Sequence, residues 1–210
     1  MPREERSYDY RLRHKPVWCA TIKSMELPIS SNEKIMVVDA ETDGLYGDFV
    51  SIGAVVYDDQ LVTTMFNGVW MKETFNDSWA DEHVKPILLD AKDNLTTYSN
   101  EEDLMNAFWD FYSQHRETCR TIGYTIYPVE CRLFQRCVEK NLEERRFQGP
   151  YPLYDLASMA PNELLRELTQ EYYREQATSV QHNHIEDCKA TAHAFFKLGQ
   201  LASSETLNNA

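Results

Sequence analysis

The amino-acid sequence predicts an α/β protein in which a mixed, five-stranded sheet is flanked by helices. Two observations support this prediction. The first half of the chain contains apolar, β-branched runs separated by turn residues, of which residues 35–41 form the clearest. The second half places apolar residues at helical spacing, as in residues 101–115. Three early strands followed by alternating helices and strands are typical of a sheet with helices packed against it.

The individual elements follow from the same patterns. The predicted strands are, in chain order, residues 35–41, 50–57, 61–70, 121–124 and 151–154. The first three should form an antiparallel meander, because residues 58–60 are suited to a tight turn. The predicted helices are residues 101–115, 128–141, 162–175 and 185–201. Pro128 is well placed to open the second of these helices, since its fixed φ suits a first helical position.

A chain of 210 residues is long enough to bury a sizeable core, so we expect one domain. We place this domain at residues 35–202, after a polar extension at residues 1–34 and before a tail at residues 203–210. The extension carries basic residues near its start, namely Arg3, Arg6, Arg11, Arg13 and Lys15. We interpret it as a solvated segment, with a basic arm that touches substrate or a partner as the alternative.

The composition limits the partners and the location of the protein. A net charge of −13 disfavours tight binding of long nucleic acid, because phosphate binding requires dense Lys and Arg, and it favours short or single-stranded ends. The five cysteines form no Cys-x-x-Cys pair, which predicts reduced thiols in a cytoplasmic protein. We expect no membrane association, because no apolar run approaches the roughly 20 residues of a membrane span and no signal peptide is evident.

Two carboxylates stand at the end of the first predicted strand. Side chains alternate between the two faces of a strand, so Asp39 and Glu41 should share a face. Two anions side by side are unfavourable unless a cation holds them. Carboxylate oxygens are the ligands that hard divalent cations such as Mg²⁺ and Mn²⁺ prefer. The end of this strand is therefore predicted to supply half of a metal site.

A second candidate group lies near the end of the chain. On a helix over residues 185–201, Asp187 begins an apolar stripe that must face the core. The stripe continues through Ala190, Thr191, Ala194, Leu198 and Leu201. Asp187 is therefore expected either to cap the helix or to hold a cation. His182 precedes it in the loop, where a histidine beside a metal-binding carboxylate can act as a general base, and His184 is the alternative base.

Together these two groups resemble the motifs of a known family. The run Asp39-Ala-Glu41-Thr-Asp-Gly, followed late in the chain by His182-x-x-x-x-Asp187, is similar to the motifs of the DnaQ-like, or DEDDh, 3′–5′ exonucleases. The resemblance covers about residues 35–200 and implies a ribonuclease H-like fold. It implies that Asp39, Glu41 and Asp187 bind metal and that His182 is the general base. The residues implied to hold the terminal nucleotide are Thr42, Asp43, Gly44 and Leu45.

The middle motif of this family normally supplies one more aspartate, near the start of the helix after the fourth strand. No aspartate is present there, and Glu130 in Tyr-Pro-Val-Glu is the only acid in the right place. On a helical wheel Glu130 shares a face with Leu133, Phe134 and Cys137, so it ends a buried stripe. The motif resembles a branch of the family with Pro-Val-Glu at this point, some members of which act on RNA. The resemblance thus implies that Glu130 is the fourth metal carboxylate.

The resemblance implies a hydrolase that removes nucleotides from the 3′ end of single-stranded RNA or DNA and releases nucleoside 5′-monophosphates. Its cofactors would be two Mg²⁺ or Mn²⁺ ions. The acidic composition and the Pro-Val-Glu branch favour RNA or short substrates. Members of the family are often dimers, so a homodimer is a candidate assembly. Two other classes stay open: a catalytically weak exonuclease-like module that binds nucleic-acid ends or proteins, and a structural metal protein.

Several acidic residues have interpretations outside the metal site. The run that begins at Asp39 also matches the opening of a calcium-binding EF-hand loop, but position twelve of that loop would be Val50, and a strand precedes it instead of a helix. Apart from the role that the resemblance implies for it, Asp43 is expected to shape the loop together with Asp48. Asp155 is expected to cap a helix.

Aromatic and basic residues are also predicted to be structural. Core packing is the preferred interpretation of Trp70, Trp79 and Trp109, with base stacking as the alternative. A basic strip consists of Arg132, Arg136 and Lys140. It lies roughly opposite Glu130 on the same helix, so we predict a solvated face and not a phosphate clamp.

Overall fold

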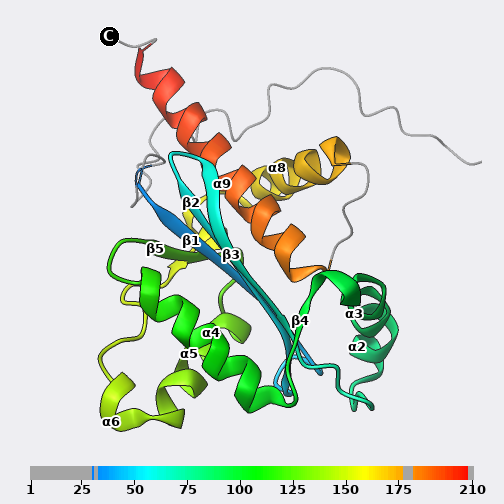
Figure 1. Ribbon diagram of the computed structural model, residues 1–210. Coiled ribbons are helices and arrows are strands. Elements are labelled where there is room, and N and C mark those ends of the chain that lie inside the picture. The colour runs from blue at the N-terminus through cyan, green and yellow to red at the C-terminus, as the bar shows by residue number, and fades with distance from the viewer. Residues whose placement is uncertain (1–29, 31–32, 177–181, 208–210) are drawn as a thin grey trace, which may run out of the picture.

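The computed structural model describes residue 30, residues 33–176 and residues 182–207, so most of the predicted N-terminal extension lies outside the described residues. The described chain forms a mixed six-stranded sheet with helices on both faces (Figure 1), which confirms the α/β class. The strands are β1 (Ile35–Thr42), β2 (Phe49–Asp58), β3 (Leu61–Val69), β4 (Thr96–Thr97), β5 (Arg120–Gly123) and β6 (Tyr154–Asp155). The helices are α2 (Ser78–His83), α3 (Lys85–Ala91), a 3₁₀ turn η1 (Lys92–Asn94), α4 (Glu101–His115), α5 (Val129–Lys140), α6 (Leu142–Arg145), α7 (Leu156–Met159), α8 (Asn162–Glu175) and α9 (His184–Leu207).

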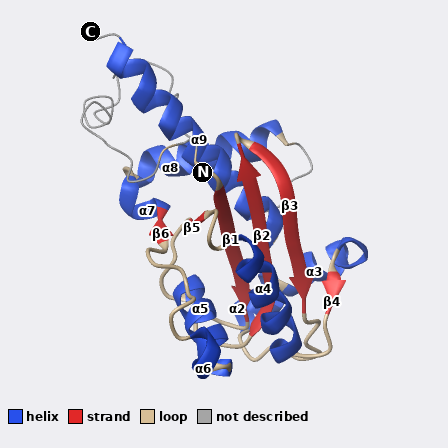
Figure 2. Ribbon diagram, turned by 60° about the vertical axis from the view of Figure 1, so that its left-hand side comes forward, coloured by secondary structure: helices blue, strands red, loops and turns tan. Residues whose placement is uncertain are grey.

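The strand order across the sheet is β4-β3-β2-β1-β5-β6. β1 pairs antiparallel with β2, and β2 with β3, so the predicted meander is confirmed. The pairs β1 with β5, β5 with β6, and β3 with β4 are parallel. Figure 2 shows the long strands β1, β2 and β3 side by side. Because β1 and β5 run parallel, their C-terminal ends point in the same direction. Asp39 and Glu41 lie near this end of β1, and Glu130 follows β5.

The number of strands differs from the predicted five. The additional strand β4 has two residues, too few to produce an alternating pattern. The last strand, β6, covers Tyr154–Asp155 and not residues 151–154. The helices α2, α3, α6 and α7 have at most seven residues each, so the sequence shows no clear helical period for them. In contrast, α9 continues to Leu207, beyond the predicted end of the domain at residue 202.

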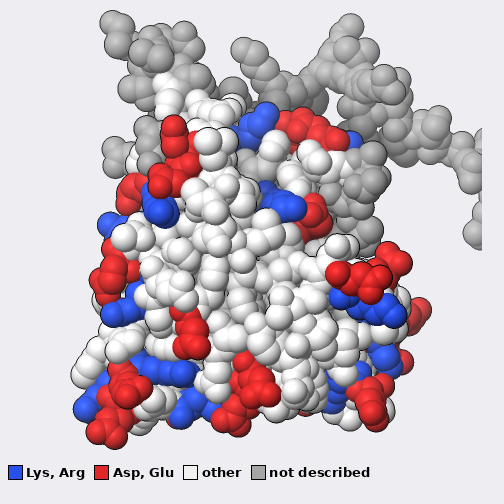
Figure 3. Space-filling view, in the orientation of Figure 1, with Lys and Arg blue, Asp and Glu red and all other residues white. Residues whose placement is uncertain are grey.

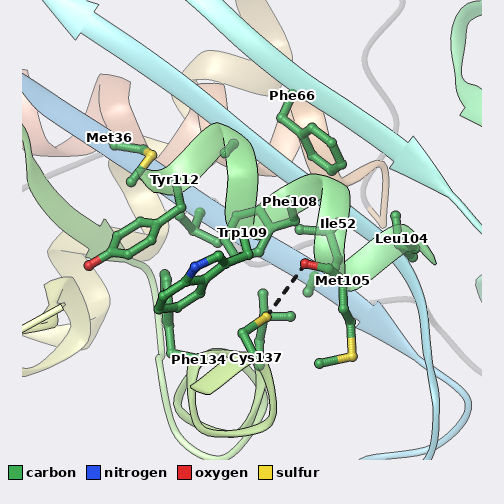
Figure 4. Close-up of a cluster of buried hydrophobic side chains, with 14 of the residues drawn as sticks. Met36, Ile52, Phe66, Leu104, Met105, Phe108, Trp109, Tyr112, Phe134 and Cys137 are labelled. Atoms are coloured by element: carbon green, nitrogen blue, oxygen red, sulfur yellow. Dashed lines mark hydrogen bonds between the residues drawn. The ribbon is translucent and has the colours of Figure 1, made fainter. Parts of the chain in front are cut away.

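The sheet separates two hydrophobic cores. Ile35 and Val37 of β1 pack with α8 and α9, whereas Met36 and Val38 pack with α4 and α5. This is the alternation predicted for β1. Figure 4 shows part of the second core, in which the aromatic side chains of α4 lie between the sheet and α5. The end of β1 is therefore covered from both faces, by helices that the chain reaches much later.

The start of α9 is capped by Asn183. The Oδ1 of Asn183 accepts hydrogen bonds from the backbone N–H groups of Ile185 (3.2 Å) and Glu186 (3.4 Å). Asparagine is among the preferred residues at this position, because its side chain satisfies donors that the first helical turn leaves without partners. The first of the two roles expected for Asp187, capping the helix, is therefore filled by another residue.

His184 attaches the start of α9 to the sheet. Its side chain is buried, and its Nε2 lies 2.6 Å from Oδ1 of Asn67 in β3. Gly53 in β2 permits this packing, because a Cβ at that position would lie 2.8 Å from His184 Cδ2. Burial also lowers the pKa of His184 to about 4. These contacts make His184 a packing residue, which contradicts the alternative that it is the general base.

Two further expectations concern location. Among the described residues, no helix combines the length and the apolar character that crossing a membrane requires. The described cysteines, Cys119, Cys131, Cys137 and Cys188, are free thiols.

Candidate metal-binding and catalytic site

Four carboxylates converge at the end of β1. Asp39 and Glu41 belong to β1 itself, whereas Glu130 comes from the first turn of α5 and Asp187 from the first turn of α9. Burial raises the pKa of Asp39 well above its usual range. The charges of Asp187, Glu41 and Glu130 add to this increase, because each disfavours a further anion nearby. The structure therefore brings together all four carboxylates that the sequence predicted as metal ligands.

One oxygen atom of the cluster, Oδ2 of Asp39, lacks the partner that a buried carboxylate oxygen normally has. It is buried and has no hydrogen-bond partner among the described residues. Leaving such a group without a partner costs about 1–3 kcal/mol or more. A cation would remove the cost, and the available donors suit a hard divalent ion. Carboxylate oxygens of Glu41 and Asp187 lie within 4.8 Å of each other and of a ring nitrogen of His182, so the carboxylates present fit a bound Mg²⁺ or Mn²⁺.

Glu130 reaches the carboxylates from the helix layer on the other face of the sheet from α9. Its Oε1 accepts a hydrogen bond from the backbone N–H of Ala40 at 3.3 Å. Burial raises the pKa of Glu130 to about 8, with smaller increases from the charges of Glu41 and Asp155. Asp155 itself caps α7, as predicted, by accepting a hydrogen bond from Ala157 N at 3.1 Å. The longer glutamate side chain thus occupies the place predicted for it in the middle motif.

His182 enters the site from the turn before α9. Its backbone φ is 64°, in the left-handed region that few residues other than glycine adopt. Its Nδ1 lies 3.6 Å from Glu41 Oε1, and this carboxylate raises the pKa of His182. The imidazole is partly exposed, so it can exchange protons with water at the site. The position fits the general base that the family resemblance implies.

Trp79 packs against His182, which the sequence did not indicate. The two rings meet edge to face with centroids 5.2 Å apart, and Trp79 also stacks on the ring of His83, with centroids 4.9 Å apart. Trp79 is 50% exposed, so the prediction of core packing is wrong for this residue. The prediction holds for Trp109, which is buried, and for Trp70, which packs against the same core. The sequence pattern does not separate Trp79 from Trp70 and Trp109, whereas the packing of the folded chain does.

A cavity of about 230 Å³ adjoins the carboxylates. Asp39, His182 and Asp187 line one part of it, and Tyr124, which follows β5, lines the remainder together with residues of α8 and α9. One of these is Tyr173 of α8, whose hydroxyl donates a hydrogen bond to Asp187 Oδ1. Burial and the negative charge of Asp187 raise the pKa of Tyr173, so this hydroxyl stays a donor. Tyr173 lies in a helical segment that carries no motif, so the sequence did not identify it.

Asp43 shapes the loop after β1. Its carboxylate accepts hydrogen bonds from Lys72 Nζ (2.6 Å), Asn76 N (2.8 Å) and Asp77 N (2.9 Å). Lys72 also pairs with Asp48 at 2.7 Å. The expectation that Asp43 and Asp48 form the loop is therefore confirmed. The Asp43 side chain is buried and engaged by these donors, so its implied nucleotide contact, which stays a prediction, would have to come from its backbone.

The other residues predicted to hold the nucleotide differ in exposure. Thr42 is buried, and Gly44 has a φ of 79°, which suits glycine at this turn. Leu45 is 57% exposed and is the one of the four that projects clearly into solvent. Arg132 of α5 donates hydrogen bonds to the carbonyl oxygens of Leu45 (2.9 Å) and Gly47 (2.7 Å), which hold the loop in place.

The predicted solvated strip on α5 is instead a set of structural contacts. Arg132 supports the loop, and Arg136 forms two hydrogen bonds with the carboxylate of Glu101, at 2.7 and 2.6 Å. Lys140 pairs with Glu102 at 3.0 Å. These contacts connect α5 to α4 and to the β1–β2 loop, and they account for the helical spacing of the strip. The prediction of a simple solvated face was wrong, because intramolecular partners are not visible in a single helix.

The fold and the site define an α/β protein whose mixed sheet ends in a cluster of four carboxylates and one histidine beside a cavity. Comparison of the chain with protein-family models finds no match. Comparison with curated proteins likewise finds no match.

The stability of the metal-free protein should fall as the pH rises from about 4 to about 8. Burial raises the pKa of Asp187 to about 7 and that of Glu130 to about 8. Between the ordinary carboxyl pKa and these raised values, the folded protein binds more protons than the unfolded chain, so increasing pH favours unfolding. Thermal unfolding in EDTA across this range measures the effect. Mn²⁺ should restore the melting temperature at the upper end, and a melting temperature that increases with pH in EDTA would contradict the interpretation.

Proposed function

We propose that this protein is a metal-dependent 3′–5′ exonuclease of the DnaQ-like (DEDDh) family, with a ribonuclease H-like fold. The observation that carries the proposal is the buried Oδ2 of Asp39, which lacks a hydrogen-bond partner among the described residues and lies near three further carboxylates. Such a cluster is stable at neutral pH only when protons or cations neutralise it. The order of the strands and the helices on both faces are compatible with the proposed fold.

In this proposal, Asp39, Glu41, Glu130 and Asp187 hold two Mg²⁺ or Mn²⁺ ions. When bound, such ions polarise a phosphodiester and lower the pKa of a water molecule. His182 would accept a proton from a water molecule at the site. Nδ1 of His182 faces Glu41 at 3.6 Å, which favours the hydrogen on Nδ1 and leaves Nε2 as the acceptor. Trp79 limits the movement of the imidazole through its contact with the ring.

The proposed substrate is the 3′ end of a short or single-stranded nucleic acid, with RNA favoured over DNA. The net charge of −13 disfavours long duplexes. Figure 3 shows acidic and basic side chains dispersed around a largely uncharged area on the face that it draws, with no continuous basic patch on that face. Leu45 and Trp79, both well exposed, are candidates to contact the terminal nucleotide. The free cysteines favour a cytoplasmic location.

A gel time course with matched 5′-labelled single-stranded RNA and DNA tests this function. With Mn²⁺ or Mg²⁺, we expect a ladder that shortens from the 3′ end, with nucleoside 5′-monophosphates as products. EDTA and the variant Asp39→Ala should each abolish the ladder, whereas Asp110→Ala, at an exposed position of α4, should not. Absence of cleavage with either substrate and either metal would refute the proposal and leave the alternative of a catalytically weak module that binds nucleic-acid ends or proteins.

A further inference from the structure

Two consecutive tyrosines near the end of α8 contact two consecutive acidic residues of α9. The hydroxyl of Tyr172 donates a hydrogen bond to Glu186 Oε2 at 2.8 Å. The hydroxyl of Tyr173 donates one to Asp187 Oδ1. The two contacts are chemically alike and join the same pair of helices. They differ in their surroundings, because Glu186 pairs with Lys189 at 2.8 Å, whereas Asp187 belongs to the carboxylate cluster.

Tyr173 also lines the cavity beside the cluster, together with Asp39 and His182. Its phenol ring is therefore anchored in α8 while its hydroxyl reaches a carboxylate that belongs to another helix. Asp187 accepts a second hydrogen bond, from the backbone of His182. Between them, these two donors restrict the rotation of the Asp187 carboxylate. A carboxylate that binds a cation benefits from such restriction, because its orientation is then set before the ion arrives.

We propose that Tyr173 is a positioning residue for the candidate cation site, which orients Asp187 through its hydroxyl. This inference rests on the proposed function only in requiring that the carboxylate cluster binds divalent cations. Tyr173 makes no contribution to the reaction itself in this proposal. Its removal should weaken the binding of the cation, with the loss of activity as a consequence that excess cation reverses.

Titration calorimetry with Mn²⁺ alone provides the first test. Tyr173→Phe keeps the ring and removes only the hydroxyl, and we expect its Mn²⁺ affinity to fall by about 10- to 100-fold. Tyr172→Phe is the matched control, because it removes the equivalent hydrogen bond between the same two helices. Its Mn²⁺ affinity should equal that of the unaltered protein. A general weakening of the α8–α9 contact would affect both variants alike, and would be visible as equal decreases in melting temperature in EDTA.

The dependence of activity on Mn²⁺ concentration provides the second test. For Tyr173→Phe, the curve should shift to higher Mn²⁺ and reach the same maximum, with the KM for substrate unchanged at saturating Mn²⁺. An affinity equal to that of the unaltered protein would refute the positioning role. A tighter affinity would refute it as well, because the hydroxyl would then compete with the cation. If the unaltered protein binds no Mn²⁺, the proposed function fails, which is a result distinct from either of these.

Discussion

Replacing His182 with alanine should lower turnover by about 10²- to 10⁴-fold and leave the affinity for Mn²⁺ nearly unchanged. The imidazole is placed to move a proton, since Glu41 lies beside its Nδ1 and Trp79 restrains its ring. The four carboxylates stay in place without it. Single-turnover cleavage assays measure the first effect, and titration calorimetry measures the second.

Two variants make this result specific. His182 has a left-handed backbone, which asparagine adopts more readily than alanine, so His182→Asn should lose activity to the same extent without added backbone strain. His83→Ala is the matched control, because His83 stacks on the same tryptophan but is exposed at the end of α2. Full activity in His182→Ala would exclude the mechanism. A parallel loss of Mn²⁺ affinity would instead make His182 a ligand.

Replacing Asp39 with asparagine should abolish cleavage and at the same time stabilise the metal-free protein. Asp39 is the carboxylate most opposed by its neighbours, and its Oδ2 has no hydrogen-bond partner among the described residues. An amide removes the charge and adds hydrogen-bond donors. The free energy of unfolding of Asp39→Asn should exceed that of the unaltered protein. This difference should increase by up to about 1.4 kcal/mol for each pH unit above the ordinary aspartate pKa. For a domain of about 150–250 residues, each kcal/mol raises the melting temperature by about 2–4 °C.

Melting curves in EDTA and in Mn²⁺ separate the two effects of this substitution. In EDTA, Asp39→Asn should unfold at a higher temperature than the unaltered protein, and the difference should increase from pH 5 to pH 8. In Mn²⁺ the order should reverse, because the variant has lost a ligand. Asp110→Asn, an exposed aspartate of α4, should change neither curve. An unchanged melting temperature in EDTA would show that the Asp39 carboxylate is not destabilising.

The long elements of the fold could be predicted from the sequence because each repeats its pattern several times. β1 alternates between the two cores from Ile35 to Val38, and α4 shows helical spacing over fifteen residues. The two-residue strands β4 and β6 depend instead on neighbouring strands that supply hydrogen bonds, so no local pattern indicates them. The same holds for the strip on α5, where Arg136 finds its partner Glu101 on another helix.

For the candidate site, too, some features were visible in the sequence and others depend on contacts between distant segments. Asp39, Glu41, His182 and Asp187 stand in short motifs, and Glu130 ends a buried stripe, so their chemistry and their position at element ends were visible in the sequence. Their convergence follows from the topology, since β1, α5 and α9 meet at one edge of the sheet. Asp43 was expected to shape the loop, but its partners, Lys72 and the backbone N–H groups of a later loop, were not visible in the sequence.

By itself, the sequence determined the class of fold, the long strands and helices, and the set of acidic residues that form the cluster, because these depend on periodicity and residue type along the chain. Tertiary structure alone decided that Trp79 packs against His182 and that Tyr173 contacts Asp187. It also decided that His184 is enclosed against Gly53 and Asn67. These contacts join segments distant in the chain, and their free energies depend on distances that only the packed structure sets.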